Sequence, residues 1–207
     1  MFEAFEGTEP RLRSRGYLPH AEAGSVPQHI VFRLYDSLPR EILERWTDKL
    51  EQVKDDEERR AERMRRIEAA LDAGSGSCFL CRPEIARIVI TSLLKFDGQR
   101  YQLHAWCIMP NHVHALVTPS PAITLSALLH TWKSFSAKQA NRVLGRSGQF
   151  WMQEYFDRYI RDERHFVSVV EYIYNNPVAA GLCTSPADWP YSSAQSGLER
   201  GHLAQWH

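Results

Sequence analysis

The sequence predicts an α+β domain built on an antiparallel β-sheet, with helices packed on the sheet and a charged helical insertion. Three observations lead to this prediction. Stretches that alternate between apolar and polar residues recur along the chain, as in half-buried strands. Amphipathic stretches with helical spacing lie between them. The chain has 207 residues, enough for one domain with a sizeable core and an insertion.

The first 27 residues are predicted to form an irregular basic arm, because prolines and glycines recur too closely for a long element. Arg11, Arg13 and Arg15 would share one face of an extended segment, an arrangement that suits contact with phosphates. A solvated basic tail explains the same residues equally well. The main domain is expected over residues 28–183, and residues 184–207 are expected to form a tail that wraps around it.

Residues 28–36 alternate and predict the first strand. The helical insertion is expected at about residues 40–76. Nearly every residue from 54 to 66 is charged, with mixed signs, which is typical of a helix that faces solvent. We therefore expect the insertion to protrude and assign it no catalytic role.

The remaining pattern is helix, strand, strand, helix, strand, helix. We expect these elements, in this order, at residues 83–96, 101–108, 112–118, from 124 to about 144, 155–160, and from 163 toward Pro177. Without the insertion, the order is β-α-β-β-α-β followed by a terminal helix. This order predicts a ferredoxin-like, or RRM-like, antiparallel sheet.

The overall charge of the chain does not indicate a nucleic-acid-binding protein. The chain has 25 basic and 25 acidic residues, so a nucleic-acid surface would have to be a local patch. No apolar run is long enough to span a membrane, and the N-terminus lacks the features of a signal peptide. The four cysteines are scattered, which favours reduced thiols and a cytoplasmic protein.

Two histidines provide the first candidate site. His112 and His114 are separated by one apolar residue and follow a break at Pro110. Side chains two apart on a strand point to the same face, so the two imidazoles project together. Such a pair is half of a divalent-metal site. The alternative is a pair of surface histidines on a half-buried strand.

The second half of the candidate site is at the end of the last predicted helix. Tyr172 and Asn176 are four residues apart and therefore share a helical face. Two imidazoles and an amide oxygen suit Mg²⁺ or Mn²⁺, and a hydroxyl beside them could act as a nucleophile in phosphoryl transfer. Tyr174 is the rival nucleophile, although it points to another face. Asn176 could instead cap the helix before Pro177.

Further basic residues are candidates for DNA contacts, with solvated charge as the alternative. Lys133, Lys138 and Arg142 lie mostly off the apolar stripe of the third predicted helix. Arg158 and Arg161 are interleaved with aromatic residues, a combination that serves stacking on bases together with phosphate contact.

Four motifs occur in a fixed order: Met-Pro-Asn-His-Val-His at 109–114, Trp-Lys-Ser-Phe at 132–135, Phe-Asp-Arg-Tyr-Ile-Arg at 156–161 and Tyr-Ile-Tyr-Asn-Asn-Pro-Val at 172–178. Together with Arg-Gly-Tyr-Leu-Pro-His at 15–20, they resemble the REP-associated tyrosine transposases, relatives of the single-tyrosine HUH transposases of bacterial insertion sequences. The resemblance covers roughly residues 11–195.

The resemblance implies a ferredoxin-like core, dependence on Mg²⁺ or Mn²⁺, and cleavage and joining of single-stranded DNA at hairpin-forming repeated palindromes. It maps the metal-binding histidines to His112 and His114, the nucleophile to Tyr172 and the amide ligand to Asn176. It favours a monomer associated with the nucleoid and leaves a dimer open. Two alternatives remain: a non-catalytic nucleic-acid-binding protein or repressor, and a metal nuclease that uses water.

Overall fold

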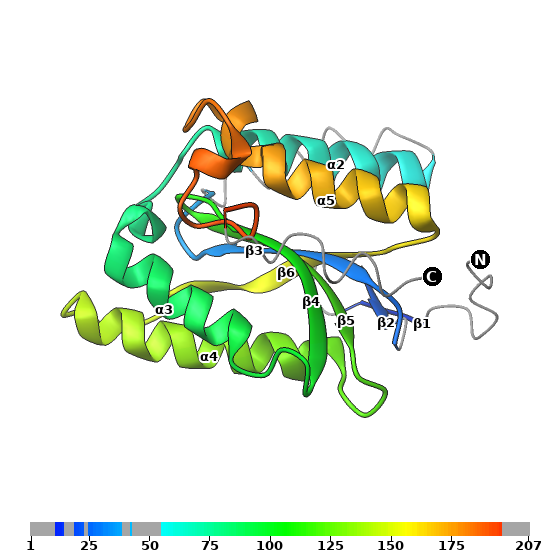
Figure 1. Ribbon diagram of the computed structural model, residues 1–207, viewed down its shortest axis with the longest axis horizontal. Helices are drawn as coiled ribbons and strands as arrows, with labels where there is room; N and C mark the ends of the chain where they lie inside the picture. The colour runs from blue at the N-terminus through cyan, green and yellow to red at the C-terminus, as the bar shows by residue number, and fades with distance from the viewer. Residues whose placement is uncertain (1–10, 15–18, 23–24, 39–41, 43–54, 196–207) are drawn as a thin grey trace.

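The computed structural model describes residues 11–14, 19–22, 25–38, 42 and 55–195 (Figure 1). Its strands are β1 (Arg11–Ser14), β2 (Pro19–Glu22), β3 (Gln28–Leu34), β4 (Tyr101–Ile108), β5 (His112–Pro119) and β6 (Trp151–Tyr159). Its helices are α2 (Asp56–Asp72), α3 (Pro83–Leu94), α4 (Leu125–Val143) and α5 (Glu163–Ala179), with short 3₁₀ turns at Phe79–Cys81 and Pro186–Asp188.

A four-stranded sheet with the order β4-β5-β3-β6 forms the centre of the domain. Every neighbouring pair of its strands is antiparallel. Strand β3 therefore lies in the interior of the sheet, between β5 and β6. This order, with α3 and α4 as the two connections of the β-α-β-β-α-β unit, confirms the predicted ferredoxin-like α+β fold.

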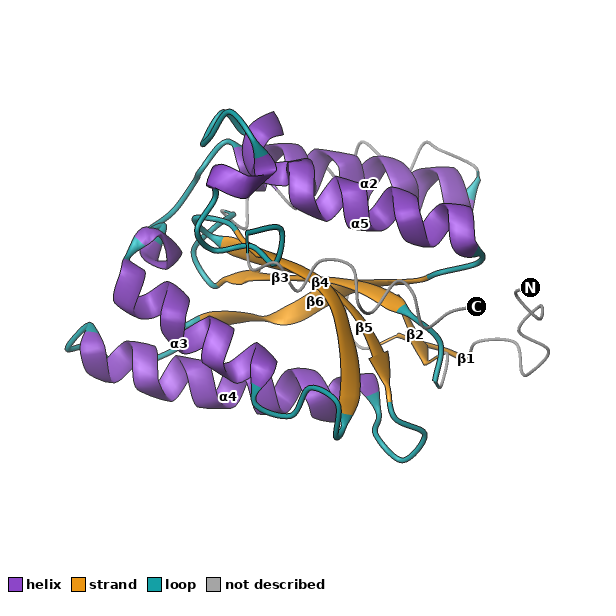
Figure 2. Ribbon diagram, in the orientation of Figure 1, coloured by secondary structure: helices purple, strands orange, loops and turns teal. Residues whose placement is uncertain are grey.

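Helices α3 and α4 cover one face of the sheet (Figure 2). Strand side chains such as Phe32 and Val113 pack there against Val89 of α3 and Trp132 of α4. Most of the large buried side chains belong to this cluster. Thr124 caps α4 as its position in the sequence predicts, since its hydroxyl accepts the Ala127 N–H at 3.2 Å.

Helices α2 and α5 lie over the opposite face. Helix α5 buries Phe166 and Ile173 against β4 and β5. Helix α2 packs through Ile67 and Leu71 onto Val31 of β3. The expectation of a protruding, solvent-facing insertion is therefore wrong for α2, because two apolar side chains four residues apart dock its C-terminal half on the sheet.

The basic N-terminal arm is not wholly irregular. Strands β1 and β2 pair in antiparallel register, with Arg11 opposite Glu22 and Arg13 opposite His20. Pro19 stands at the first position of β2, where a proline does not interrupt the ladder. Arg15 lies outside the described residues, as does the part of the predicted insertion before residue 55, except Ile42.

The segment after α5 runs along the edge of β4. Ser192 forms an isolated antiparallel bridge with Cys107, and the Trp189 indole donates to the Ile108 carbonyl at 2.9 Å. The segment thus covers a strand edge that would otherwise be open. Among the described helices, none is both long and apolar enough to cross a membrane.

Candidate functional site

The two predicted metal-binding histidines lie side by side on β5 and are fully buried. His112 is opposite Arg33 of β3, and His114 is opposite Val31 of β3 and Cys107 of β4. Both imidazoles therefore face the layer of α2 and α5. Their Nε2 atoms are 2.9 Å apart. Because alternate side chains of a strand point to the same face, His112 and His114 lie together, as expected.

Asn111 fixes the first of these imidazoles. Its side-chain oxygen lies 2.7 Å from Nδ1 of His112, and its amide N–H groups donate to the Leu71 and Ser75 carbonyls at 3.0 and 2.9 Å. Because both amide hydrogens are used, the oxygen faces His112 and Nδ1 of His112 is the donor. The lone pair of His112 Nε2 therefore faces His114.

A third buried imidazole was not anticipated. His29 of β3 lies with its Nε2 3.2 Å from Nδ1 of His114, and the two rings are nearly parallel, with centroids 5.4 Å apart. A signal was present in the sequence, because His29, Val31 and Arg33 occupy one face of the first predicted strand. In a ferredoxin-like sheet that strand is the neighbour of the His-x-His strand.

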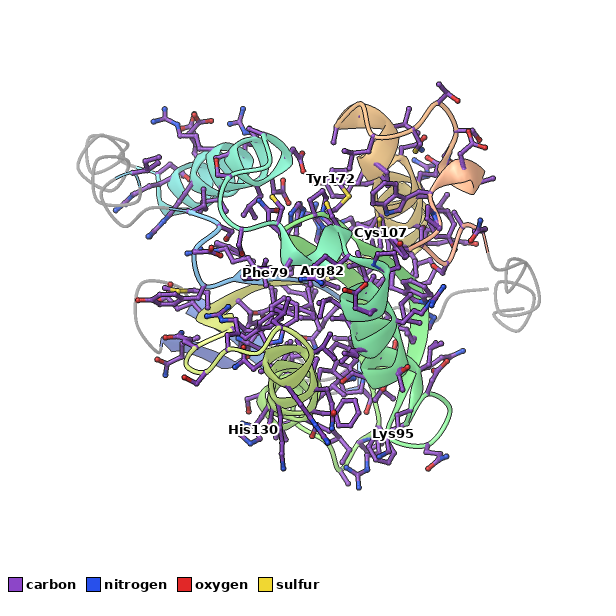
Figure 3. The ribbon with its side chains drawn as sticks, turned by 90° about the vertical axis from the view of Figure 1, so that its left-hand side faces the viewer. Phe79, Arg82, Lys95, Cys107, His130 and Tyr172 are labelled. Carbon is purple, nitrogen blue, oxygen red and sulfur yellow. The ribbon has the colours of Figure 1, made fainter. Side chains whose placement is uncertain are left out.

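Tyr172 extends from α5 toward this cluster, and Figure 3 shows it between α5 and α2. Its ring meets the rings of His114 and His29 edge-on, with centroid distances of 5.6 and 5.9 Å. The Asn176 side chain interacts with the Tyr172 hydroxyl. The side chains four residues apart thus face the same side, as expected from helical spacing.

Helix α5 continues through Pro177 to Ala179, and its C-cap is Ala180. Asn176 is therefore inside the helix, and the alternative that it serves as the cap is wrong. Pro177 removes only one N–H donor in the last turn, where the loss of one helical hydrogen bond is tolerated. The side-chain oxygen of Asn176 is buried and has no hydrogen-bond partner.

Tyr174 lies elsewhere on α5. It packs at the edge of the apolar cluster that includes Ile173 and Trp189. Tyr172, in contrast, contacts the ring of His114 directly, with 5.6 Å between the ring centroids. The geometry therefore favours Tyr172 over Tyr174 as the residue beside the histidines.

Helix α2 adds two carboxylates that were not assigned to the site. The Glu68 carboxylate interacts with the Tyr172 hydroxyl, and Asp72 Oδ1 lies 3.6 Å from His112 Nε2. They are four residues apart and follow the buried Ile67 and Leu71, respectively. This apolar pair directly after the charged run was the signal that one face of the helix turns inward.

Burial sets the protonation of the cluster. It lowers the pKa of His29 to about 4 and that of His112 to about 3, and it lowers the pKa of His114 as well. It raises the pKa of Glu68 to about 7 and that of Asp72 to about 6. Burial also raises the pKa of Tyr172, and the Glu68 and Asp72 charges raise it further. The imidazoles are therefore neutral at pH 7, as metal ligands must be.

The donor set fits a divalent cation. Two ligand atoms about 2.1 Å from one ion and at right angles to each other are about 3.0 Å apart, close to the spacing of the two Nε2 atoms. The unpartnered oxygens of Asn176 and Asp72 are hard donors. Among the described residues, no three His, Cys, Asp or Glu side chains form a metal site by themselves.

The candidate DNA-contacting residues do not form one patch. Arg158 of β6 is opposite His29 in the sheet and thus lies on the face of Tyr172. Arg161, which is exposed, follows this strand. Lys133 and Lys138 belong to α4 on the other face, as does Arg142. Of Arg11 and Arg13 only the backbone is described.

Lys133 is engaged within the protein. Its ammonium group donates to the Gln153 carbonyl at 2.8 Å and lies 5.9 Å from the centre of the Tyr155 ring. Burial lowers its pKa to about 8. These contacts favour an internal role in holding α4 against β6.

Comparison with known proteins places this geometry in context. Residues 88–176 match the transposase family described as IS200-like. This IS200-like segment contains His112, His114, Tyr172 and Asn176, whereas Glu68, Asp72 and His29 precede it. The resemblance to REP-associated tyrosine transposases is confirmed by the relatives that match.

The chain is 28% identical over 112 residues to the REP-associated tyrosine transposase of Escherichia coli K12, a match that covers 53% of this chain and 65% of the relative. It is 30% identical over 103 residues to a Haemophilus influenzae protein assigned provisionally to the same group, covering 45% of this chain and 58% of the relative. The chain thus spans less than two thirds of each of these curated relatives.

A solved structure of a REP-associated tyrosine transposase bound to a REP hairpin is also similar. It has a TM-score of 0.55 and 17% identity and covers 90% of this chain and 87% of that chain. At this level of identity, the similarity supports the fold. The α+β architecture of the IS200-like segment and of the elements around it is therefore shared with a DNA-bound relative.

Proposed function

We propose that this protein cleaves and rejoins single-stranded DNA at hairpin-forming repeated palindromes through a covalent 5′-phosphotyrosine at Tyr172. One observation supports this proposal above all. The Tyr172 ring lies against a buried His pair whose Nε2 atoms are spaced for a divalent cation. The transposase family match and the REP hairpin named for the similar solved structure support the class of reaction and substrate.

His112 and His114 would hold Mg²⁺ or Mn²⁺ through Nε2, with the Asn176 side-chain oxygen as a third donor. A cation bound there supplies polarisation of the scissile phosphate and offsets the charge that develops on it. The Asn176 side chain also interacts with the Tyr172 hydroxyl, so one residue would link the nucleophile to the metal-binding group.

Tyr172 needs to lose its proton to be a good nucleophile, since a free phenol has a pKa of about 10. The Glu68 carboxylate interacts with this hydroxyl and would act as the proton acceptor. The phenolic oxygen forms a bond to the phosphorus atom, the bond from phosphorus to the 3′ oxygen breaks, and that oxygen takes up a proton as it leaves.

The adduct conserves the energy of the phosphodiester bond. Attack by a 3′ hydroxyl on the phosphotyrosine would release Tyr172 and restore a continuous strand, with the protons moving in the opposite directions. Cleavage and joining therefore use the same residues. Arg158 lies on the same face as Tyr172 and would contact the DNA backbone there.

A denaturing gel tests this proposal. The substrates are hairpin oligonucleotides from palindromic repeats that flank the gene, each labelled at the 5′ or the 3′ end, with and without Mn²⁺. We expect a metal-dependent protein–DNA adduct with wild type and with Tyr174→Phe, and none with Tyr172→Phe. Cleavage without an adduct would indicate a water-using nuclease. Binding without cleavage would indicate a non-catalytic DNA-binding protein.

A further inference from the structure

The hydrogen bonds of the His cluster determine where each proton lies. Asn111 receives a hydrogen bond from Nδ1 of His112, so Nε2 of His112 is an acceptor. The 2.9 Å contact between the two Nε2 atoms then requires that His114 donate from Nε2. A neutral imidazole has one N–H group, so Nδ1 of His114 is an acceptor. His29 must therefore donate to it from Nε2.

In this arrangement, the hydrogen on Nε2 of His114 prevents that atom from binding a metal ion. Nε2 of His112 has a free lone pair, whereas Nε2 of His114 bears a hydrogen. For both Nε2 lone pairs to face one cation, His114 must carry its proton on Nδ1 and donate from that atom. The atom that lies 3.2 Å away in this direction is Nε2 of His29.

Resting on the proposed function, we infer that His29 is a positioning residue that sets the tautomer and the ring orientation of His114. An imidazole suits this task because its Nε2 can donate or accept, depending on which nitrogen bears its hydrogen. When the His114 proton moves from Nε2 to Nδ1, the His29 proton moves from Nε2 to Nδ1. The number of protons is unchanged, and the two rings remain hydrogen-bonded.

The position of His29 supports this inference. It lies on β3, an interior strand held by β5 and β6, and it is only 9% exposed. The planes of its ring and the His114 ring are nearly parallel, at an angle of 13°, which suits a hydrogen bond between their edges. A metal ligand commonly has its second ring nitrogen hydrogen-bonded in this way, and loss of such a partner lowers metal affinity about 10–100-fold.

The test measures Mn²⁺ binding by electron paramagnetic resonance and calorimetry, without DNA. We expect His29→Phe, which retains a ring but cannot hydrogen-bond, to bind Mn²⁺ about 10–100-fold more weakly than wild type. His29→Gln, which can donate and accept, should remain within about threefold. His104→Phe is the matched control, because His104 hydrogen-bonds Thr118 on the same sheet, away from the cluster. Its affinity should equal that of wild type.

A second measurement follows the proton directly. With Mg²⁺ added, ¹⁵N spectra of the histidine rings should show that His114 changes from the Nε2–H to the Nδ1–H form in wild type. A folded His29→Phe protein that binds Mn²⁺ as tightly as wild type would overturn the inference and leave the proposed function intact. Failure of wild type and His112→Ala alike to bind Mn²⁺ would overturn both.

Discussion

The side-chain oxygen of Asn111 lies 2.7 Å from Nδ1 of His112, so two consecutive residues hydrogen-bond through their side chains. The same amide donates to the carbonyls of Leu71 and Ser75, at the end of α2 and just after it. One buried side chain therefore joins the insertion to the strand of the candidate site.

Replacing Asn111 should weaken both stability and metal binding. Asn111→Ala leaves two carbonyls and the His112 N–H without partners, and we expect the free energy of unfolding to fall by about 2–3 kcal/mol. Urea unfolding measures this loss. Asn175→Ala is the control, since that exposed amide donates only to a carbonyl of its own helix. Equal stability of the two variants would contradict this account of Asn111.

Glu68→Gln should slow formation of the covalent adduct about 100-fold or more, because the amide cannot take the proton of Tyr172. Single-turnover assays with a labelled hairpin measure the rate, and gel shifts measure binding, which should be unchanged. Glu62→Gln on the same helix is the matched control. Glu62 pairs with Arg66 at 2.7 Å and should be dispensable. Loss of adduct in both variants would point to damage to α2 instead.

The same substitution predicts a change in the dependence of stability on pH. The pKa of Glu68 is raised from 4.5 to about 7, chiefly by burial. Its contribution to stability is thus complete below pH 4.5 and is lost as the pH rises through about 7. The free energy of unfolding of wild type minus that of Glu68→Gln should therefore fall over this range. Urea unfolding in chelator measures it, and a constant difference would contradict the raised pKa.

The buried histidines act in the opposite sense. The pKa values of His29 and His112 are lowered from 6.5 to about 4 and about 3, so their contribution is complete above pH 6.5 and is lost as the pH falls toward these values. In the Glu68→Gln protein only the raised pKa of Asp72 still opposes this trend, and it is outweighed by the two histidines, so we expect stability to fall below pH 6.5. Stability that rises on acidification of this variant would contradict burial of neutral imidazoles.

Binding of the hairpin should depend on Arg158 more than on Lys138. Arg158 shares the sheet face of Tyr172, whereas Lys138 is on α4 across the sheet. We expect Arg158→Gln to weaken hairpin binding and to reduce the slope of log affinity against log salt by about 1. Lys138→Gln should change neither. Fluorescence anisotropy at several salt concentrations measures both quantities, and the reverse ranking would place the DNA on the α4 face.

The fold and half of the site could be read from local patterns. Alternation located the strands, and the spacing of His112 from His114 and of Tyr172 from Asn176 follows from strand and helix geometry alone. His29 could not be assigned in this way, because its partner is 85 residues away and their contact depends on strand order. The ferredoxin-like strand order places the strand of His29 next to that of His114, so their contact can be predicted once this fold is assumed.

The insertion was misjudged for a different physical reason. A charged run indicates a solvated helix on average, but Ile67 and Leu71 suffice to bury one stripe of it. Charged side chains next to these apolar residues become partly buried as well. Glu68 and Asp72 are such side chains. The length of β6 was also underestimated, since it begins at Trp151 instead of residue 155.

Helix α2 is expected to detach from the sheet before the rest of the domain unfolds. The three histidines are held by the sheet, but Glu68 and Asp72 belong to a helix attached to it by a small apolar cluster and by the hydrogen bonds of the Asn111 amide. Units with few buried contacts open at lower free energy than the core, and hydrogen exchange detects such openings. The site would therefore be dismantled and rebuilt by local motion of one helix, without global unfolding of the domain.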